Sequence, residues 1–134
     1  MGGMILQDAK SVESALEEII YGEFPQGKTV QSVSIVSKSG LLVAGKAASP
    51  SRTETFSAMS AIMYSAAEAT KNDVFKDGID YLMAAFHNTK LFITELSPSL
   101  LLVASADRDT EDSAILESME KVVSRTKADM SWLR

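Results

Sequence analysis

The chain has 134 residues, of which 46% are apolar and 23% charged; it carries a formal net charge of −5 and contains no cysteine. The length suits one core, and the missing cysteines exclude disulfides, thiol catalysis and cysteine-based metal sites. The acidic charge without a Lys/Arg cluster argues against nucleic acid as a partner, and the lack of an apolar run of ~20 residues argues against membrane insertion. We expect one cytoplasmic domain over residues 1–134, with its core at about 8–130.

A helix followed by a β-hairpin is predicted for the first third of the chain. The helix covers residues 8–21, where apolar side chains recur at helical spacing. The hairpin strands cover residues 30–37 and 41–45, which are rich in β-branched and aliphatic residues. Gly40 is expected to adopt the positive φ that the turn between the strands requires.

The next predicted element is a helix over residues 51–71. Ser51 and Glu54 form a capping-box pattern at its start, and Asn72 and Asp73 end it. A helical wheel gives it a narrow polar stripe of Ser57, Tyr64, Glu68 and Lys71. A stripe with larger side chains contains Phe56, Met59, Met63, Ala66 and Thr70. An adjacent stripe of mostly small residues contains Ala58, Ala61, Ile62, Ser65 and Ala69.

Apolar or small residues thus surround well over half of this helix, which is more than the ~100° arc of an ordinary surface helix. One sheet covers only one side of a helix. We expect the larger stripe to pack on the chain's own sheet and the small-residue stripe to need a second partner. That partner is either another helix of the same chain or a second copy of the chain, for which a twofold dimer is the usual symmetry.

Three strands and a helix are predicted for the second half. The strands cover residues 79–86, 91–96 and 100–106, and the helix begins near Thr110. The third strand is an almost unbroken apolar run, which is typical of a central strand covered on both faces. Short turns join neighbouring strands, so the fold class is α/β (α+β) with the order α-β-β-α-β-β-β-α. We expect a five-stranded, mainly antiparallel sheet with helices on both faces.

The strand at residues 79–86 bears on self-association. Residues 81–86 carry no charge, whereas natural edge strands usually carry Lys, Pro or a bulge that blocks further pairing. If this strand lies at an edge of the sheet, it can pair with the same strand of a second copy. If it is central, it gives self-association no support.

No set of residues in the sequence predicts catalysis, a cofactor or a metal. The only histidine, His87, lies in a predicted turn without ligand-spaced partners. The acidic residues near Asp73 and Asp107 lack the calcium-loop pattern, and the Gly-Lys pairs lack the phosphate-loop pattern. No nucleophile elbow is present. We therefore expect a protein that is not an enzyme and does not bind GTP itself.

Several segments resemble roadblock domains, also known as the dynein light chain roadblock type. Residues 33–45, Val-Ser-Ile-Val-Ser-Lys-Ser-Gly-Leu-Leu-Val-Ala-Gly, resemble the opening hairpin of the family. Residues 56–68, Phe-Ser-Ala-Met-Ser-Ala-Ile-Met-Tyr-Ser-Ala-Ala-Glu, resemble its small-residue-rich helix. The apolar stretches at 91–94 and 100–104 are similar to its last strands. The resemblance extends from about residue 11 to residue 127.

The resemblance implies a profilin-like sandwich, with the middle helix on one face of the sheet and the terminal helices on the other. It also implies homodimers in which the middle helices meet and the third strands form a continuous ten-stranded sheet. Carried over, the dimer surface comprises Ala58, Ala61, Ile62, Ser65 and Ala69 of the helix and Ile79, Tyr81, Met83 and Ala85 of the strand at residues 79–86.

The function that the resemblance implies is a scaffold or regulator of a Ras-like small GTPase. Two alternatives belong to other classes. A purely structural dimeric adaptor would share the dimer surface without acting on a GTPase. A small-ligand sensor of a related fold would need a concave site formed within the domain.

Overall fold

The computed structural model describes the backbone of residues 2–24 and 30–131, and within these ranges the side chains from residue 12 onward. The α-helices of the described residues are α1 (Gly2–Glu23), α2 (Thr53–Thr70) and α3 (Asp112–Asp129). The strands are β1 (Val30–Ser37), β2 (Leu42–Gly45), β3 (Leu82–Ala85), β4 (Thr89–Ser97) and β5 (Leu100–Asp107). A 3-10 turn, η1 (Pro50–Arg52), precedes α2, and a π-helical turn, η2 (Lys71–Phe75), follows it. The predicted order α-β-β-α-β-β-β-α is confirmed.

The strands form one antiparallel sheet in the order β2-β1-β5-β4-β3. β5 lies in the middle, and residues 100–106 are all buried, which confirms the prediction from their apolar run. β3 lies at an outer edge of the sheet. Of the two positions considered for residues 79–86, edge and central, the structure has the edge position. Only Leu82–Ala85 of that segment form the strand.

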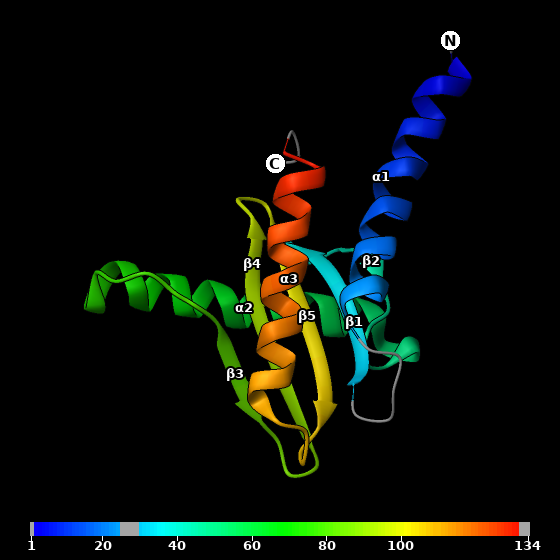
Figure 1. Ribbon diagram of the computed structural model, residues 1–134. Coiled ribbons are helices and arrows are strands. Elements are labelled where there is room, and N and C mark those ends of the chain that lie inside the picture. Colours follow the sequence, from blue (N-terminus) through cyan, green and yellow to red (C-terminus); the bar gives the residue numbers. More distant parts are fainter. Residues whose placement is uncertain (1, 25–29, 132–134) are drawn as a thin grey trace.

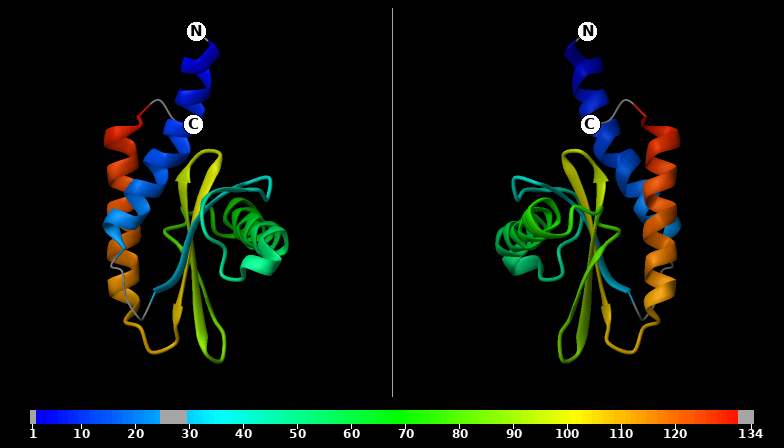
Figure 2. Two further views of the ribbon diagram at one scale, coloured as in Figure 1. Left: turned by 90° about the vertical axis from the view of Figure 1, so that its right-hand side faces the viewer. Right: turned by 90° about the vertical axis from the view of Figure 1, so that its left-hand side faces the viewer.

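Helices cover both faces of the sheet. Figure 2 shows α1 and α3 together on one face and α2 alone on the other, as the resemblance implies. Alternate residues of β5 serve two apolar cores because successive side chains of a strand point to opposite faces. Leu102 belongs to the core that contains Leu16 of α1 and Met119 of α3. Val103 belongs to the core that contains Tyr64 of α2.

Two predictions about the ends of α2 are wrong. The capping box is not formed, because η1 leads directly into the helix and neither Ser51 nor Glu54 caps it; the hydroxyl of Thr53 instead donates to the carbonyl oxygen of Pro50 at 3.0 Å. α2 (Figure 1) ends at Thr70, close to the predicted residue 71, but Asn72 and Asp73 do not end the helical path, since the π-helical turn η2 continues it to Phe75. The path ends at Lys76, whose φ of 54° is left-handed and whose N–H donates to the carbonyl oxygen of Lys71.

The β1–β2 hairpin depends on two glycines with positive φ. Gly40 has a φ of 96°, which confirms the prediction for the turn. Gly45, at the end of β2, has a φ of 80° that the sequence did not reveal. A Cβ atom there would overlap the carbonyl oxygen of Val33 and lie 2.9 Å from Cδ1 of Ile20. Gly45 therefore allows close contact between β2, β1 and α1.

Candidate interaction surface

The face of α2 that packs on the sheet agrees with the predicted one only in part: Phe56 and Met63 are partly buried and pack against the core under the helix, as predicted. The buried residues of the helix are Ser57, Ser60, Ala61 and Tyr64. Of these, Ser57 and Tyr64 were assigned to the polar stripe that should face solvent. The other members of the predicted inward stripe lie outside, since Met59 is 50% exposed and Ala66 and Thr70 are also exposed.

The packing partners of Tyr64 explain this orientation. Its ring belongs to the core formed with Val36, Leu91 and Leu101, and burying an aromatic ring of this size outweighs burying a thioether side chain. Nearer the start of α2, the helix lies close to the β1–β2 turn: a Cβ atom at Gly40 would lie 3.3 Å from Cα of Ala58. Small side chains on both sides let the helix lie close to the sheet.

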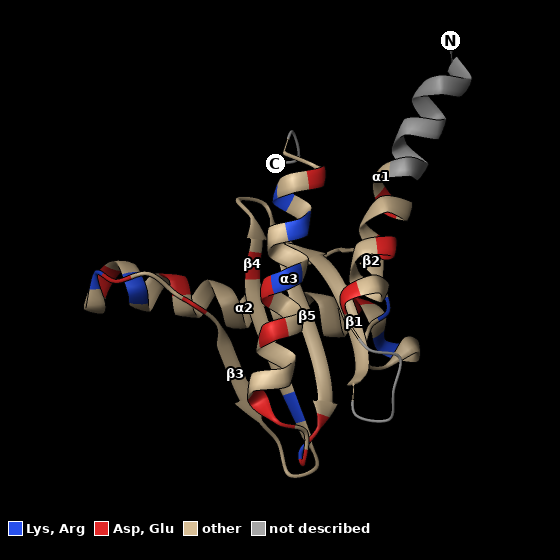
Figure 3. Cartoon of the chain, in the orientation of Figure 1, with Lys and Arg blue, Asp and Glu red and all other residues tan. Residues whose placement is uncertain are grey.

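The outward face of α2 carries an exposed apolar surface. Met59 is 50% exposed and Ile62 is 57% exposed. Among the small residues predicted for the interface, Ser65 and Ala69 are exposed and Ala58 is partly buried. Ala61 is buried against its own chain. Figure 3 shows this part of α2 without charge, and the sequence has no charged residue between Glu54 and Glu68.

β3 has a free outer edge among the described residues. Its inner edge pairs with β4, with Leu82 opposite Ile93 and Ala85 opposite Lys90. No strand of the described residues pairs with its outer edge. Met83 and Ala85 are exposed, whereas Leu82 and Ala84 lie against the core under α2. The strand carries no charge that would repel another strand.

Exposed apolar side chains flank β3 on both sides. Tyr81 is 46% exposed and Phe86 is 53% exposed, whereas Ile79 is partly buried. Val74 and Phe75, on the π-helical turn η2, are 65% and 71% exposed. The sequence did not indicate a role for Val74 and Phe75, because they lie beyond the predicted end of the helix. We call Met59, Ile62, Val74, Phe75 and strand β3 the α2–β3 surface.

An ionic cluster fixes the second half of α2 to the sheet. Nζ of Lys38, in the β1–β2 turn, lies 3.2 Å from a carboxylate oxygen of Glu68 on α2 and 2.9 Å from one of Glu95 on β4. It also lies 5.6 Å from the centre of the Tyr64 ring. Burial alone would lower the pKa of Lys38, but its hydrogen bonds to Glu95 and Glu68 raise it overall. Burial, and then the charges of Glu95 and Glu68, raise the pKa of Tyr64.

These pKa shifts predict a loss of stability at alkaline pH. A group whose pKa is higher in the folded state stabilises fully below its unfolded pKa, which is about 10 for Tyr, and loses this contribution as the pH rises through the folded value. We expect the melting temperature to fall above pH ~10 and to fall less steeply in Tyr64→Phe. Thermal unfolding between neutral and alkaline pH measures this. Tyr81→Phe, outside the cluster, is the control; equal slopes for the two variants would contradict the assignment to Tyr64.

The described residues contain no group of three or more His, Cys, Asp or Glu side chains that could hold a metal ion. His87 is exposed between β3 and β4, in the region where a turn was predicted. No described helix has the length and apolar character needed to cross a membrane.

The chain is similar to known proteins in both sequence and structure. The family model described as Roadblock/LC7 domain matches residues 17–106. A Roadblock/LC7 domain from Streptomyces avermitilis is similar with a TM-score of 0.74 and 17% identity, covering 86% of this chain and 97% of that one. MglB from Myxococcus xanthus is similar with a TM-score of 0.71 and 14% identity, covering 94% and 92%. An MglB described with a tetrameric arrangement has a TM-score of 0.69 and 15% identity, covering 87% and 86%.

At these identities the structural similarity shows the fold, and the predicted roadblock-type fold class is confirmed. No curated protein matched the chain.

Proposed function

Because this chain belongs to the Roadblock/LC7 domain family, whose members are protein-interaction modules, we propose that it acts as a homodimeric scaffold or regulator of a Ras-like small GTPase. The observation that carries the proposal is the α2–β3 surface. The domain carries both an uncharged helix face with half-exposed Met59 and Ile62 and an edge strand, β3, whose outer edge no strand of the described residues pairs with. Such a surface on a small domain marks a protein interface.

A second copy of the chain fits this surface. A twofold axis can place α2 beside α2 and the outer edge of β3 beside the same edge of the other copy. The backbone groups of both edges are then paired, and the exposed side chains of Met59 and Ile62 leave water. The neighbour described as an MglB with tetrameric arrangement supports self-association as a property to test here.

The GTPase part of the proposal rests on the family resemblance. The sequence lacks a phosphate-binding loop, so the nucleotide would belong to the partner. The test mixes the purified dimer with a Ras-like GTPase from the same genome, loaded with GTP or with GDP. Binding with altered GTP hydrolysis or nucleotide release supports a regulator, binding without either supports a scaffold, and no binding to either form rejects a GTPase partner.

Cysteine cross-linking can locate the twofold axis, since the natural chain has no cysteine. For α2 of both copies to lie on the same face of a continuous sheet, the axis must be perpendicular to the sheet. It then passes midway between one residue of β3 and the same residue of the second copy. A residue cannot lie opposite its sequence neighbour, because neighbouring residues point to opposite faces. We expect one of the single variants Leu82→Cys, Met83→Cys, Ala84→Cys and Ala85→Cys to form an intermolecular disulfide efficiently, since directly opposed residues have Cα atoms within disulfide range.

Non-reducing electrophoresis after mild oxidation measures this cross-linking. Ser124→Cys, on the exposed side of α3, is the control for random collision. Cross-linking of the β3 variants at the rate of this control would show that β3 does not meet its own copy.

A further inference from the structure

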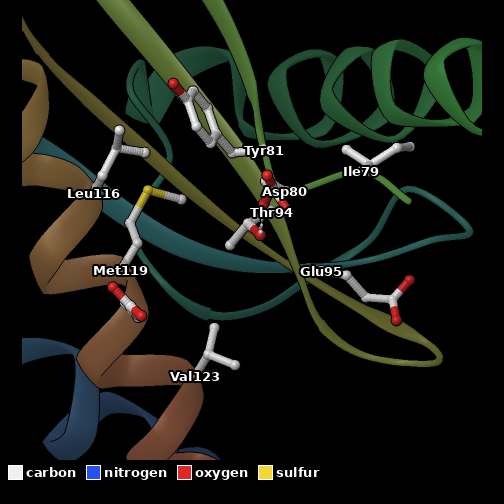
Figure 4. A pocket seen from close by; sticks show the side chains of 9 residues that line it. Ile79, Asp80, Tyr81, Thr94, Glu95, Leu116, Met119 and Val123 are labelled. Atoms are coloured by element: carbon white, nitrogen blue, oxygen red, sulfur yellow. Dashed lines mark hydrogen bonds between the residues drawn. The ribbon is translucent and has the colours of Figure 1, made fainter. Parts of the chain in front are cut away.

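A groove lies between α3 and the edge of the sheet (Figure 4), and it shares Ile79 and Tyr81 with the dimer surface that the resemblance implies. It has a volume of about 420 Å³, within the range of about 300–1,000 Å³ that is typical of ligand sites. It is lined by Ile79, Asp80, Tyr81, Thr94, Glu95, Leu116, Met119, Glu120 and Val123. None of these residues belongs to β3.

The groove exists because β3 is shorter than β4. Pairing between the two strands ends at Leu82 and Ile93, so the preceding segment, residues 79–81, leaves the sheet beside Thr94. The hydroxyl of Thr94 donates to the backbone carbonyl oxygen of Asp80 at 3.0 Å, which fixes this segment. The space between the segment and α3 remains open.

Part of the groove wall is apolar. Met119 is buried, while Leu116 and Val123 are partly buried and pack against the same core. On the opposite wall Tyr81 stacks on Phe92 with the ring centres 6.5 Å apart, yet Tyr81 is still 46% exposed. This part of the groove can therefore take aliphatic side chains.

The rim of the groove is acidic. Asp80 and Glu120 are exposed, and neither has an ion-pair partner among the described residues. Glu95 also reaches the groove but is already bound to Lys38. No Lys or Arg of the described residues lines the groove, and the whole chain is acidic. The field at the groove therefore favours a cation.

We propose that this groove docks a segment of a partner protein in which Lys or Arg residues flank two or more aliphatic residues. The aliphatic side chains enter between Tyr81 and Val123, and the basic side chains pair with Asp80 and Glu120. The acidic rim repels anionic membranes and nucleic acid, which leaves a basic protein segment as the complementary macromolecule. The charged residues that the proposal uses, Asp80 and Glu120, lie outside α2, β3 and the predicted dimer surface, so their variants test the groove apart from the dimer.

A model peptide tests the groove. The probe is a labelled amphipathic peptide with Leu at positions i, i+3, i+4 and i+7 and Lys elsewhere, and the comparison peptide has Gln in place of Lys. We expect the variant Asp80→Lys/Glu120→Lys to weaken binding of the Lys peptide at least about tenfold in fluorescence anisotropy. The matched variant Glu13→Lys/Glu18→Lys changes the net charge by the same amount at exposed positions of α1. Its affinity for the Lys peptide should stay within about twofold of that of the natural chain.

Amide chemical shifts of the labelled protein place the bound peptide. Changes confined to residues 79–81, 94–95 and 116–123 support the proposal. Equal weakening in both double variants, equal binding of the Gln peptide, or changes centred on α2 would overturn it. Spermine binding at the groove as tightly as the peptide would make the occupant a small cation and would also overturn it. Light scattering should give the groove variant the same mass as the natural chain, which separates this outcome from a failure of the proposed dimer.

Discussion

Ile62→Glu should convert the protein from a dimer to a folded monomer. We expect the dissociation constant of the dimer to rise at least ~100-fold, which corresponds to a loss of about 2.7 kcal/mol of binding free energy. Ile62 is 57% exposed on the outward face of α2. Fully burying an isoleucine is worth roughly 1.5–3 kcal/mol, and twofold symmetry counts the remaining exposed part twice. The substitution removes this gain and also places two carboxylates in an apolar contact, where burial without a partner costs several kcal/mol.

Sedimentation equilibrium over a range of concentrations measures this change. Because Ile62 does not belong to either apolar core, the far-UV spectrum and unfolding of the monomer should stay close to those of the natural chain under dissociating conditions. Ser124→Glu adds the same charge at an exposed position of α3 and should leave the dimer intact. A natural chain that is monomeric at high micromolar concentration would reject the proposed assembly altogether.

Gly45→Ala is expected to cause the largest loss of folding stability, about 3 kcal/mol or more. The left-handed conformation at φ 80° costs a non-glycine residue about 1–2 kcal/mol. The added Cβ atom also meets the carbonyl oxygen of Val33, which cannot move freely because it accepts a hydrogen bond from the N–H of Lys46 at 3.0 Å. Relieving this overlap must separate β2 from β1 or from Ile20 of α1, and overpacking of this kind costs about 1–3 kcal/mol.

Gly78→Ala is the matched control for this variant. A Cβ atom at Gly78 meets nothing within 4 Å, and its backbone φ is not positive. Alanine at this position lowers the conformational entropy of the unfolded chain. The free energy of unfolding should therefore stay unchanged or rise by about 0.4–1 kcal/mol. Urea unfolding of both variants gives the two free energies. A Gly45→Ala variant as stable as Gly78→Ala would show that the β1–β2 hairpin does not require this close approach.

The sequence predicted the elements of the fold and their order because these depend on local periodicity. The buried character of β5 followed from residues 100–106 alone, since an almost unbroken apolar run is typical of a strand covered on both faces. Gly40 followed from the geometry of a short turn. Gly45 did not, because its requirement arises from β1 and α1, which are distant along the chain.

The tertiary structure decided which side of α2 faces inward. A helical wheel states which residues share a face, but not which face meets the sheet. The packing of Tyr64, Phe56 and Met63 on the sheet settled that, and it placed Met59 outside and Ala61 inside. The groove beside α3 likewise follows from β3 ending before β4 does. Surplus apolar surface on α2 could therefore be predicted from composition, whereas its position depends on contacts between segments far apart in the sequence.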